Sequence, residues 1–351
     1  MSILAKPLKA GSLELSNRMI MAPLTRARAG ESRVPNELMA EYYSQRASAG
    51  LILTEATIMD PMGAGYAGTP GIYNEAQVEG WKKITKAVHA KGGKIVLQIW
   101  HVGRISDPMF LNGELPVAPS AIQPAGHVSL VRPEKNYVTP RALETHEVDL
   151  IIEGFRKGAE NAKRAGFDGI ELHAANGYLI DQFLQDKTNR RTDKYGGPIE
   201  NRARLLLDIT DALIKVWGAG YVGVHLAPRM DAHDMGDSDP KATFGYVARE
   251  LGKRKIAFIF TREAQGDDAL YPYLKKEFGG VLIANQKVTK EEAEKIIERG
   301  DADAVAWGVN FITNPDLPKR FLENLPLNQP QEMATFYGGG KEGYTDYPFH
   351  G

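Results

Sequence analysis

Three side chains that can donate hydrogen bonds or protons lie within six residues of one another. His173 ends an apolar segment that begins at Gly169, and Asn176 and Tyr178 follow it directly. Polar residues at the end of a strand are exposed where a ligand can reach them. His173 and Asn176 together can donate two hydrogen bonds to one carbonyl or phenolate-like oxygen, and Tyr178 offers a phenol with an ordinary pKa near ~10 as a proton donor. Such residues can also simply cap a strand, but the three together favour a functional role.

Eight short apolar segments recur along the chain, and amphipathic segments separate most of them. The strands predicted from them are Arg18–Leu24, Gly50–Glu55, Lys94–Trp100, Gly169–His173, Val222–Leu226, Ala257–Phe260, Gly280–Ala284 and Ala302–Trp307. The predicted helices are Pro35–Ala49, Ala76–Ala90, His146–Ala165, Ile199–Trp217, Lys241–Arg254, Leu270–Phe278 and Lys290–Arg299. This alternation indicates an α/β fold, a closed (β/α)8 TIM barrel. A doubly wound sheet is the alternative, but no Gly-x-Gly-x-x-Gly fingerprint follows the first strand.

Barrels of this kind routinely exceed about 250 residues as single domains, so 351 residues suit one domain over residues 1–351. Leu4–Leu15 is expected to form an N-terminal hairpin that plugs the bottom of the barrel. Residues 104–144, after the third strand, are rich in Pro and Gly and show no helical period, so we expect either a lid or subdomain on the active face or a surface excursion along the barrel flank. The tail, residues 329–351, is rich in Gly and Tyr and is expected to fold onto the rest of the chain.

Composition excludes several kinds of site. The chain contains no cysteine, which rules out disulfides, thiolate metal sites and a cysteine nucleophile. Its 43 Lys+Arg and 44 Asp+Glu give a net charge of -1, so we expect no nucleic-acid partner. Lys6 and Pro7 interrupt the first residues, and no apolar stretch reaches the length of a membrane span. We therefore expect a cytoplasmic protein without a membrane segment.

The ends of the predicted strands define the active face of a barrel. Amides, imidazoles and hydroxyls dominate there, for example Thr25, Gln98, His225 and Asn285. The paired carboxylates of a glycosidase and the His pairs of a metal site are both missing. This set suits a flat cofactor rich in heteroatoms better than a metal ion.

Six motifs, in matching order along nearly the whole chain, resemble the Old Yellow Enzyme family of flavin-dependent ene-reductases. They are Met21–Arg26, Tyr43–Gly50, Gln98–Arg104, His173–Tyr178, Asn189–Gly197 with Glu200–Arg202, and Gly343–Pro348. Residues 222–236 are similar to the bacterial xenobiotic reductase subgroup, which acts on nitrate esters and nitroaromatics. The resemblance implies tightly but non-covalently bound FMN, NAD(P)H as reductant, and an electron-poor alkene or nitro compound as acceptor.

The resemblance also implies the roles of individual residues. His173 and Asn176 would hold the activating oxygen of the substrate, and Tyr178 would give a proton to its α-carbon. The implied cofactor-binding residues are Pro23, Leu24, Thr25, Ala56, Gln98, His173, Asn176, His225, Asn285, Gln286, Lys287, Gly308 and Val309. The implied substrate-binding residues are Thr25, Tyr66, Trp100, His173, Asn176, Tyr178 and Tyr337. Aromatic residues also fill protein cores, and this alternative is stronger for Trp100 than for Tyr337.

Two positions depart from the family pattern. His225 stands at the end of the fifth strand, where many members have an Arg near flavin N1 and O2. An imidazole, with an ordinary pKa of ~6.5, carries a charge only when protonated, so we expect a flavin potential that is unusually sensitive to pH. Arg229 is an alternative source of that charge. Val309 stands where the family commonly has an Arg beside the phosphate, and either Lys287 or Arg262 is expected to replace it.

The favoured function is an FMN-dependent NAD(P)H oxidoreductase that reduces the activated C=C bonds of enones, maleimides and nitroalkenes. Denitration of nitrate esters and reduction of nitroaromatics are further expected activities. Two alternatives stay open at this point: a metal-independent barrel lyase or isomerase acting on a phosphorylated substrate, and a catalytically idle flavin-binding protein. The chain is expected to be a monomer or a homodimer.

Overall fold

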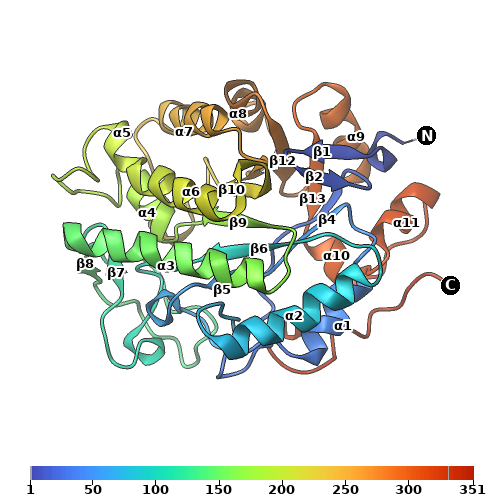
Figure 1. Ribbon diagram of the computed structural model, residues 1–351, viewed down its shortest axis with the longest axis horizontal. Helices are drawn as coiled ribbons and strands as arrows, with labels where there is room; N and C mark the ends of the chain where they lie inside the picture. Colours follow the sequence, from blue (N-terminus) through green and yellow to red (C-terminus); the bar gives the residue numbers. More distant parts are fainter. Residues whose placement is uncertain (1, 331) are drawn as a thin grey trace.

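Eight parallel strands close into a barrel (Figure 1). A computed structural model describes residues 2–330 and 332–351 of the chain. The barrel strands are β3 (Met19–Met21), β4 (Leu51–Leu53), β6 (Ile95–Trp100), β9 (Gly169–Ala174), β10 (Val222–Leu226), β11 (Phe258–Arg262), β12 (Val281–Asn285) and β13 (Ala304–Trp307). Every neighbouring pair is parallel, and β13 pairs with β3 to complete the ring. The predicted TIM barrel is confirmed, and the doubly wound alternative is wrong.

Helices surround the barrel on its outside. They are α1 (Glu37–Gln45), α2 (Glu75–His89), α3 (Thr145–Arg164), α4 (Leu179–Leu184), α5 (Ile199–Arg202), α6 (Arg204–Trp217), α7 (Pro240–Arg254), α8 (Tyr271–Phe278), α9 (Lys290–Glu298), α10 (Val309–Thr313) and α11 (Leu317–Glu323). Local chemistry sets their starts: the side chains of Asn36, Asn74 and Thr289 each accept a hydrogen bond from a backbone N–H in the first turn. The prediction of a single helix over Ile199–Trp217 is wrong, because the helix is interrupted at Ala203, between α5 and α6.

The predicted N-terminal hairpin is present as β1 (Leu8–Ala10) and β2 (Leu13–Leu15), which pair antiparallel. Its buried residues Ala10, Leu13 and Leu15 pack in one cluster with side chains of the barrel interior. The turn at Gly11 has φ +60°, and a side chain there would meet the carbonyl oxygen of Gly220 at 2.6 Å. The hairpin therefore lies directly against the segment that leads into β10, at the amino-terminal end of the strands.

Residues 104–144 form the excursion between β6 and α3. Within it, β7 (Val117–Ala118) pairs with β8 (Arg141–Ala142), and the rest is largely irregular. Its buried residues Leu111, Val128 and Tyr137 pack in one cluster with Tyr66 and Trp100. A short strand, β5 (Thr57–Ile58), pairs with the end of β6 beside this cluster. The excursion thus buttresses the end of the third barrel strand.

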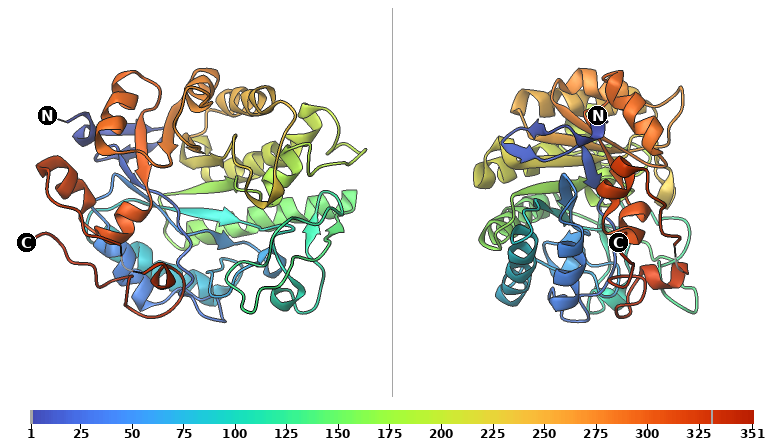
Figure 2. Two further views of the ribbon diagram at one scale, coloured as in Figure 1. Left: turned by 180° about the vertical axis from the view of Figure 1, so that it is seen from behind. Right: turned by 90° about the vertical axis from the view of Figure 1, so that its right-hand side faces the viewer.

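The C-terminal tail folds back along the molecule, as Figure 2 shows in red. Arginines near its path donate to its backbone carbonyls: Arg26 to Phe336 and Gly343, Arg28 to Thr335, Gly340 and Glu342, and Arg46 to Tyr344. Tyr344 is fully buried and stacks on Tyr42 with ring centroids 4.1 Å apart. Buried carbonyls need such donors, so the arginines fix the course of the tail.

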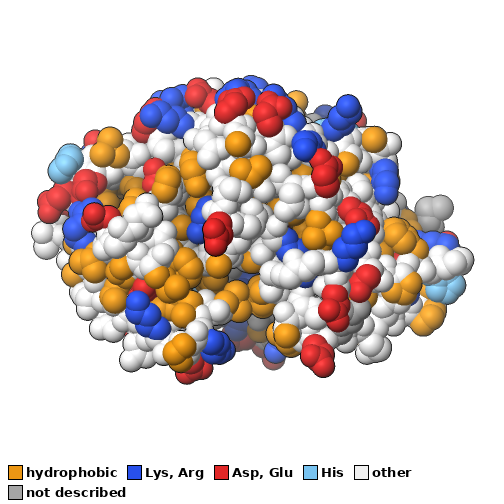
Figure 3. All heavy atoms as spheres, turned by 90° about the horizontal axis from the view of Figure 1, so that it is seen from below, with side chains coloured by type: hydrophobic (Ala, Val, Ile, Leu, Met, Phe, Trp, Pro, Cys, Tyr) orange, Lys and Arg blue, Asp and Glu red, His pale blue; other side chains and the backbone are white. Residues whose placement is uncertain are grey.

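Basic and acidic side chains are interspersed over the face shown in Figure 3. Among residues 2–330 and 332–351, no helix combines the length and the apolar character needed to cross a membrane.

Candidate active site

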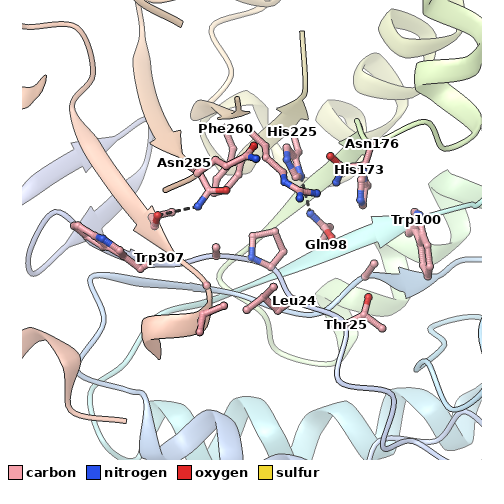
Figure 4. A pocket seen from close by; sticks show the side chains of 18 of the residues that line it. Leu24, Thr25, Gln98, Trp100, His173, Asn176, His225, Phe260, Asn285 and Trp307 are labelled. Atoms are coloured by element: carbon pink, nitrogen blue, oxygen red, sulfur yellow. Dashed lines mark hydrogen bonds between the residues drawn. The ribbon is translucent and has the colours of Figure 1, made fainter. Parts of the chain in front are cut away.

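A cavity of about 490 Å³ lies at the carboxyl ends of the barrel strands (Figure 4). Its volume is within the ordinary range for a small-molecule or cofactor site. The residues that line it are Ala22, Pro23, Leu24, Thr25, Ala56, Gln98, Trp100, His173, Asn176, Tyr178, His225, Phe260, Arg262, Asn285, Gln286, Lys287, Val288, Ala306, Trp307, Gly308, Val309, Asn310 and Tyr337. Every site residue predicted from the sequence is among them except Tyr66.

The turn after β9 presents Asn176 and Tyr178 to the cavity. Asn176 and Gly177 have φ angles of 59° and 78°, a conformation that Asn and Gly tolerate best. A side chain at Gly177 would also meet Met235 at 2.9 Å. The N–H of Gly177 donates to Asp181 over 2.9 Å, and Gln182 donates to the carbonyl of Gly177 over 2.8 Å. The turn is therefore fixed by glycine at one position and by two side chains of α4.

His173 is neutral in this environment. Burial, and the nearby charge of Arg262, lower the pKa of His173 to about 3. Its ring lies between Trp100 and His225, with ring centroids at 6.1 and 5.0 Å and small interplanar angles of 20° and 26°. A neutral imidazole can donate one ring N–H to a ligand oxygen without a change of protonation state.

Tyr178 stands edge-on to both neighbouring rings. Its centroid is 4.9 Å from that of Trp100 and 5.1 Å from that of His173, with interplanar angles of 84° and 90°. Burial raises the pKa of Tyr178 to about 12, although a hydrogen bond with Tyr66 acts in the opposite direction. The phenol is therefore protonated at neutral pH and can serve as an acid.

Tyr66 lies behind Tyr178 and does not line the cavity. Its hydroxyl is 2.8 Å from the hydroxyl of Tyr178, and its ring stacks on Trp100 with centroids 5.6 Å apart. The sequence prediction of direct substrate contact through Tyr66 is thus not supported by its position. Tyr66 instead contacts the hydroxyl of Tyr178 and the ring of Trp100, both of which line the cavity.

Gln98 links two strands beneath the cavity. Its Nε2 donates to Glu171 Oε2 over 2.8 Å and to His225 Nδ1 over 3.1 Å. With Nδ1 as the acceptor, the proton of a neutral His225 is on Nε2, which is buried and has no partner in residues 2–330 and 332–351. Burial, followed by the neighbouring His173 and Arg262, lowers the pKa of His225 well below its ordinary value. This lowered pKa argues against a charged His225 at neutral pH, so it does not support the pH-sensitive flavin potential expected from this residue.

Two permanent cations line the cavity, and they are Arg262 and Lys287. Within the described part of the chain, no carboxylate pairs with the guanidinium of Arg262, whose charge interacts with Tyr178 and Tyr337. Arg229, the alternative suggested by the sequence, turns away: its Nε donates to Glu263 over 2.7 Å, and it also pairs with Asp268. Arg229 is not part of the cavity wall.

The far end of the cavity is built from the loops after β12 and β13. Gln286 and Lys287 have φ angles of 106° and 52°, which places two non-glycine residues in the left-handed half of conformational space. Such strain is concentrated at functional sites in proteins. Gly308 approaches Leu24 so closely that a side chain there would meet it at 2.9 Å. Figure 4 shows Asn285 and Trp307 at this end and Trp100 and His173 at the other.

Several lining residues were not predicted, and Phe260 and Trp307 are the largest of them. Phe260 and Arg262 are two positions apart on β11, so their side chains lie on the same face of the strand. The period-two pattern of that strand could therefore have indicated that Phe260 also faces the cavity. Trp307, at the end of β13, donates from Nε1 to the carbonyl of Val288 in the loop after β12 over 2.7 Å, a contact that no local pattern encodes.

The hydrogen-bonding groups of the cavity fit FMN, the cofactor implied by the sequence. Five buried polar atoms of cavity residues have no partner among the described residues: Trp100 Nε1, His173 Nδ1, Asn176 Oδ1, His225 Nε2 and Gln286 Oε1. Buried polar atoms nearly always find a partner, so these atoms call for a ligand rich in hydrogen-bonding groups. Within the described residues, no cluster of three or more His, Asp or Glu could hold a metal ion.

Comparison with known proteins gives a consistent result. The model of the NADH:flavin oxidoreductase / NADH oxidase family matches residues 3–328. A probable flavin mononucleotide-dependent alkene reductase from Leishmania infantum is 44% identical over 99% of this chain and 97% of its own length. The 12-oxophytodienoate reductase 1 of Oryza sativa subsp. japonica is also 44% identical, over 99% of this chain and 93% of its own length.

Solved structures agree with this assignment. Morphinone reductase in complex with tetrahydroNAD superimposes with a TM-score of 0.95 at 47% identity and covers 99% of this chain and 98% of its own. The old yellow enzyme homologue from Zymomonas mobilis gives the same TM-score at 44% identity, over 98% of this chain and 99% of its own. The chain therefore belongs to the NADH:flavin oxidoreductase / NADH oxidase family, in its Old Yellow Enzyme branch of FMN-dependent, NAD(P)H-consuming ene-reductases.

Proposed function

We propose that this enzyme reduces the C=C bond of enones, maleimides and nitroalkenes, with His173 and Asn176 as the oxygen-binding pair and Tyr178 as the proton donor. The observation that carries the proposal is that these three side chains line one cavity close together, with the rings of His173 and Tyr178 5.1 Å apart. His173 and Asn176 lie at the end of the cavity opposite Trp307 (Figure 4). A non-redox lyase or isomerase is not favoured by the family assignment.

The oxygen-binding pair polarises the substrate. A carbonyl or nitro oxygen held by the neutral His173 and by Asn176 draws electron density from the attached C=C bond. Because the pKa of His173 is lowered to about 3, the ring stays neutral around neutral pH and its donor role does not change there. Trp100 and Tyr337 offer flat walls on which an electron-poor alkene can pack.

Tyr178 completes the reduction. FMN, when bound, would supply the hydride chemistry between NAD(P)H and the β-carbon of the substrate. Tyr178 delivers its hydroxyl proton to the α-carbon, and the hydroxyl of Tyr66, 2.8 Å away, stabilises the phenolate that is left. Solvent then returns the proton to Tyr178.

The cofactor would be held by the residues that line the rest of the cavity. Pro23, Leu24, Thr25 and Ala56 supply one wall, and Gln98 and His225 supply hydrogen-bonding groups for the ring. Asn285, Gln286, Lys287, Gly308 and Val309 surround the end that would take the phosphate. The whole chain would work as one FMN-binding unit, and the excursion 104–144 would support the substrate wall, because its residues pack behind Trp100 and none of them lines the cavity.

Activity towards nitrate esters and nitroaromatics is a second candidate. A nitro group offers acceptor oxygens to His173 and Asn176, as an enone does through its single carbonyl oxygen. Release of nitrite from a nitrate ester under anaerobic conditions would test it separately.

A spectrum of the purified protein tests the main proposal. We expect flavin absorbance that bleaches on anaerobic addition of NADPH and returns on addition of 2-cyclohexenone. Protein that holds no flavin after incubation with FMN would contradict the proposal. Protein that is reduced but never reoxidised by any enone, maleimide or nitroalkene would be an idle flavin-binding protein.

A further inference from the structure

Arg262 occupies a defined level of the barrel. On β10, His225 is paired in register with His173 of β9 and with Phe260 of β11, so these three residues form one layer. The ring centroids of His225 and Phe260 are 4.5 Å apart. Arg262 follows Phe260 by two positions on the same face of β11, because side chains alternate along a strand and both residues line the cavity. The guanidinium therefore extends above His225, towards the open end of the barrel.

The electrostatic influence of Arg262 also places its charge near His173 and His225. Arg262 lowers the pKa of His173 and of His225, and it also acts to lower the pKa of Tyr178. Lys287, the other lining cation, is not among the main influences on these pKa values and belongs to the loop after β12. The ring-binding end of the cavity thus has one permanent cation, and the opposite end has the other.

His225 cannot provide that charge itself. Its imidazole is buried against His173 and Phe260, and its Nδ1 is already occupied by the Gln98 amide. A neutral imidazole still donates from Nε2, but it does not offset a full negative charge. Arg229, four residues further on, is held by Glu263 and Asp268 outside the cavity.

We propose that Arg262, on the sixth barrel strand, contacts the flavin and supplies the positive charge that stabilises its reduced form, while the neutral His225 on the fifth strand contributes only a hydrogen bond. This inference rests on the proposed function, since it requires bound FMN. It also assigns Arg262 to the ring and leaves Lys287 for the phosphate, which separates the two candidates that the sequence left open for one position.

The charge balance gives the reason. A hydride carries two electrons and one proton, so its transfer from NAD(P)H to the neutral oxidised ring leaves one negative charge on the ring. Burial lowers the pKa of Arg262 from its ordinary value, but a guanidinium remains charged around neutral pH, so it favours the reduced form there. Because Arg262 has no carboxylate partner among the described residues, its charge is not already neutralised by the protein.

The experiment measures the midpoint potential of bound FMN and the dissociation constant of oxidised FMN in four proteins besides the wild type. They are Arg262→Gln, Arg262→Lys, the double variant His225→Arg/Arg262→Gln, and Arg229→Gln as the matched control. Arg262→Gln should weaken the binding of reduced FMN at least tenfold relative to oxidised FMN, which for a two-electron couple lowers the potential by about 30 mV or more. Arg262→Lys and the double variant should recover most of this loss, because each returns a cation to the ring, and Arg229→Gln should match the wild type.

Equal potentials in Arg262→Gln and Arg229→Gln would overturn the inference while leaving the proposed function intact. A wild-type protein without bound, reducible FMN would instead overturn the proposed function. Should Arg262→Gln fail to retain FMN, the double variant decides: recovery of both FMN binding and potential supports the charge assignment, and absence of recovery overturns it.

Discussion

Tyr178 and its neighbour Tyr66 show how the protein prepares an acid from a residue that is ordinarily a weak one. Burial raises the pKa of Tyr178 to about 12, and the hydrogen bond with Tyr66 lowers it from a still higher value. The balance keeps the proton on Tyr178 until the substrate carbon accepts it. The same hydrogen bond then stabilises the phenolate, so Tyr66 acts on the product side of the proton transfer.

Replacement of Tyr178 by Phe should separate the two half-reactions. Reduction of the flavin by NADPH should continue at nearly the wild-type rate, because that step needs no proton donor at this position. Reoxidation by 2-cyclohexenone should slow by about 10²-fold or more, the usual contribution of a positioned general acid. Anaerobic stopped-flow measurements of both half-reactions provide the check.

Tyr66→Phe is the matched control for that experiment. It removes one hydroxyl 2.8 Å from Tyr178 and leaves the Trp100 stack in place, so reoxidation should slow only several-fold. A collapse of the reductive half-reaction in Tyr178→Phe would contradict the assigned role.

At the scale of the elements, the apolar strands and their polar ends could be predicted, whereas contacts between distant loops could not. The eight strands were recognisable because each is buried on both faces and reads as a short apolar run. Thr25, Gln98 and His225 could be assigned to the active face because each lies at or just after the end of a predicted strand. The position of Tyr66 behind Tyr178 depends on the packing of residues more than 100 positions apart, and no local period records it.

Backbone geometry set a similar limit. The break between α5 and α6 interrupts a continuous amphipathic pattern, so the sequence predicted one helix. The direction of Arg262 and Arg229 depended on which of them meets a carboxylate, and Glu263 and Asp268 decide this only in the folded chain.

The tail is the element whose attachment is easiest to test. Arg28 donates to the carbonyls of Thr335, Gly340 and Glu342, and its removal by Arg28→Met would leave them without these donors. We expect the loss of about 2–4 kcal/mol of local stability, because each is a charge-assisted hydrogen bond. Limited proteolysis should then cut residues 332–343 faster than in the wild type, and substrate KM should rise, since Tyr337 of this segment lines the cavity.

Arg249→Met is a suitable control for the tail experiment. Arg249 pairs with Glu277 on the helical surface, and its side chain is 47% exposed. Unchanged proteolysis in Arg249→Met together with unchanged proteolysis in Arg28→Met would mean that the arginine contacts do not hold the tail.

For the whole molecule, buried titratable groups of two kinds limit stability from opposite sides of the pH scale. His101 and His173 have pKa values lowered to about 3 by burial, so unfolding takes up protons below pH ~6.5 and stability falls as the solution becomes more acidic. Burial raises the pKa of Glu171 to about 8 and that of Asp181 to about 7. These carboxyls stay protonated in the folded chain and ionise on unfolding. They therefore reduce the stability of the folded chain as the pH rises from ~4, the ordinary carboxyl pKa, to these raised values. We expect maximal stability in mildly acidic solution.

Asp181→Asn should shift the pH of maximal stability to a higher value. Asp181 is fully buried on α4, outside the cavity, and accepts hydrogen bonds from Gly177 N over 2.9 Å and from Gln185 Nε2 over 2.7 Å. Asparagine keeps the shape, and a flip of the Gln185 amide preserves both contacts. The folded-state pKa is raised, so the wild type loses stability between pH ~4 and about 7 and the variant does not. The gain should be absent near pH 4 and reach on the order of 3–4 kcal/mol above pH 7.

Urea unfolding of both proteins at pH 4.5 and pH 8, with FMN in constant excess, measures this difference. Asp193→Asn provides a control of opposite sign, because the hydrogen bonds from Arg191 hold the pKa of Asp193 below its ordinary value. Ionised Asp193 stabilises the folded chain above pH ~4, so its loss should destabilise the protein at pH 8 and matter less as the pH falls. A stability gain in Asp181→Asn that is equal at both pH values would show that Asp181 is already ionised in the folded state.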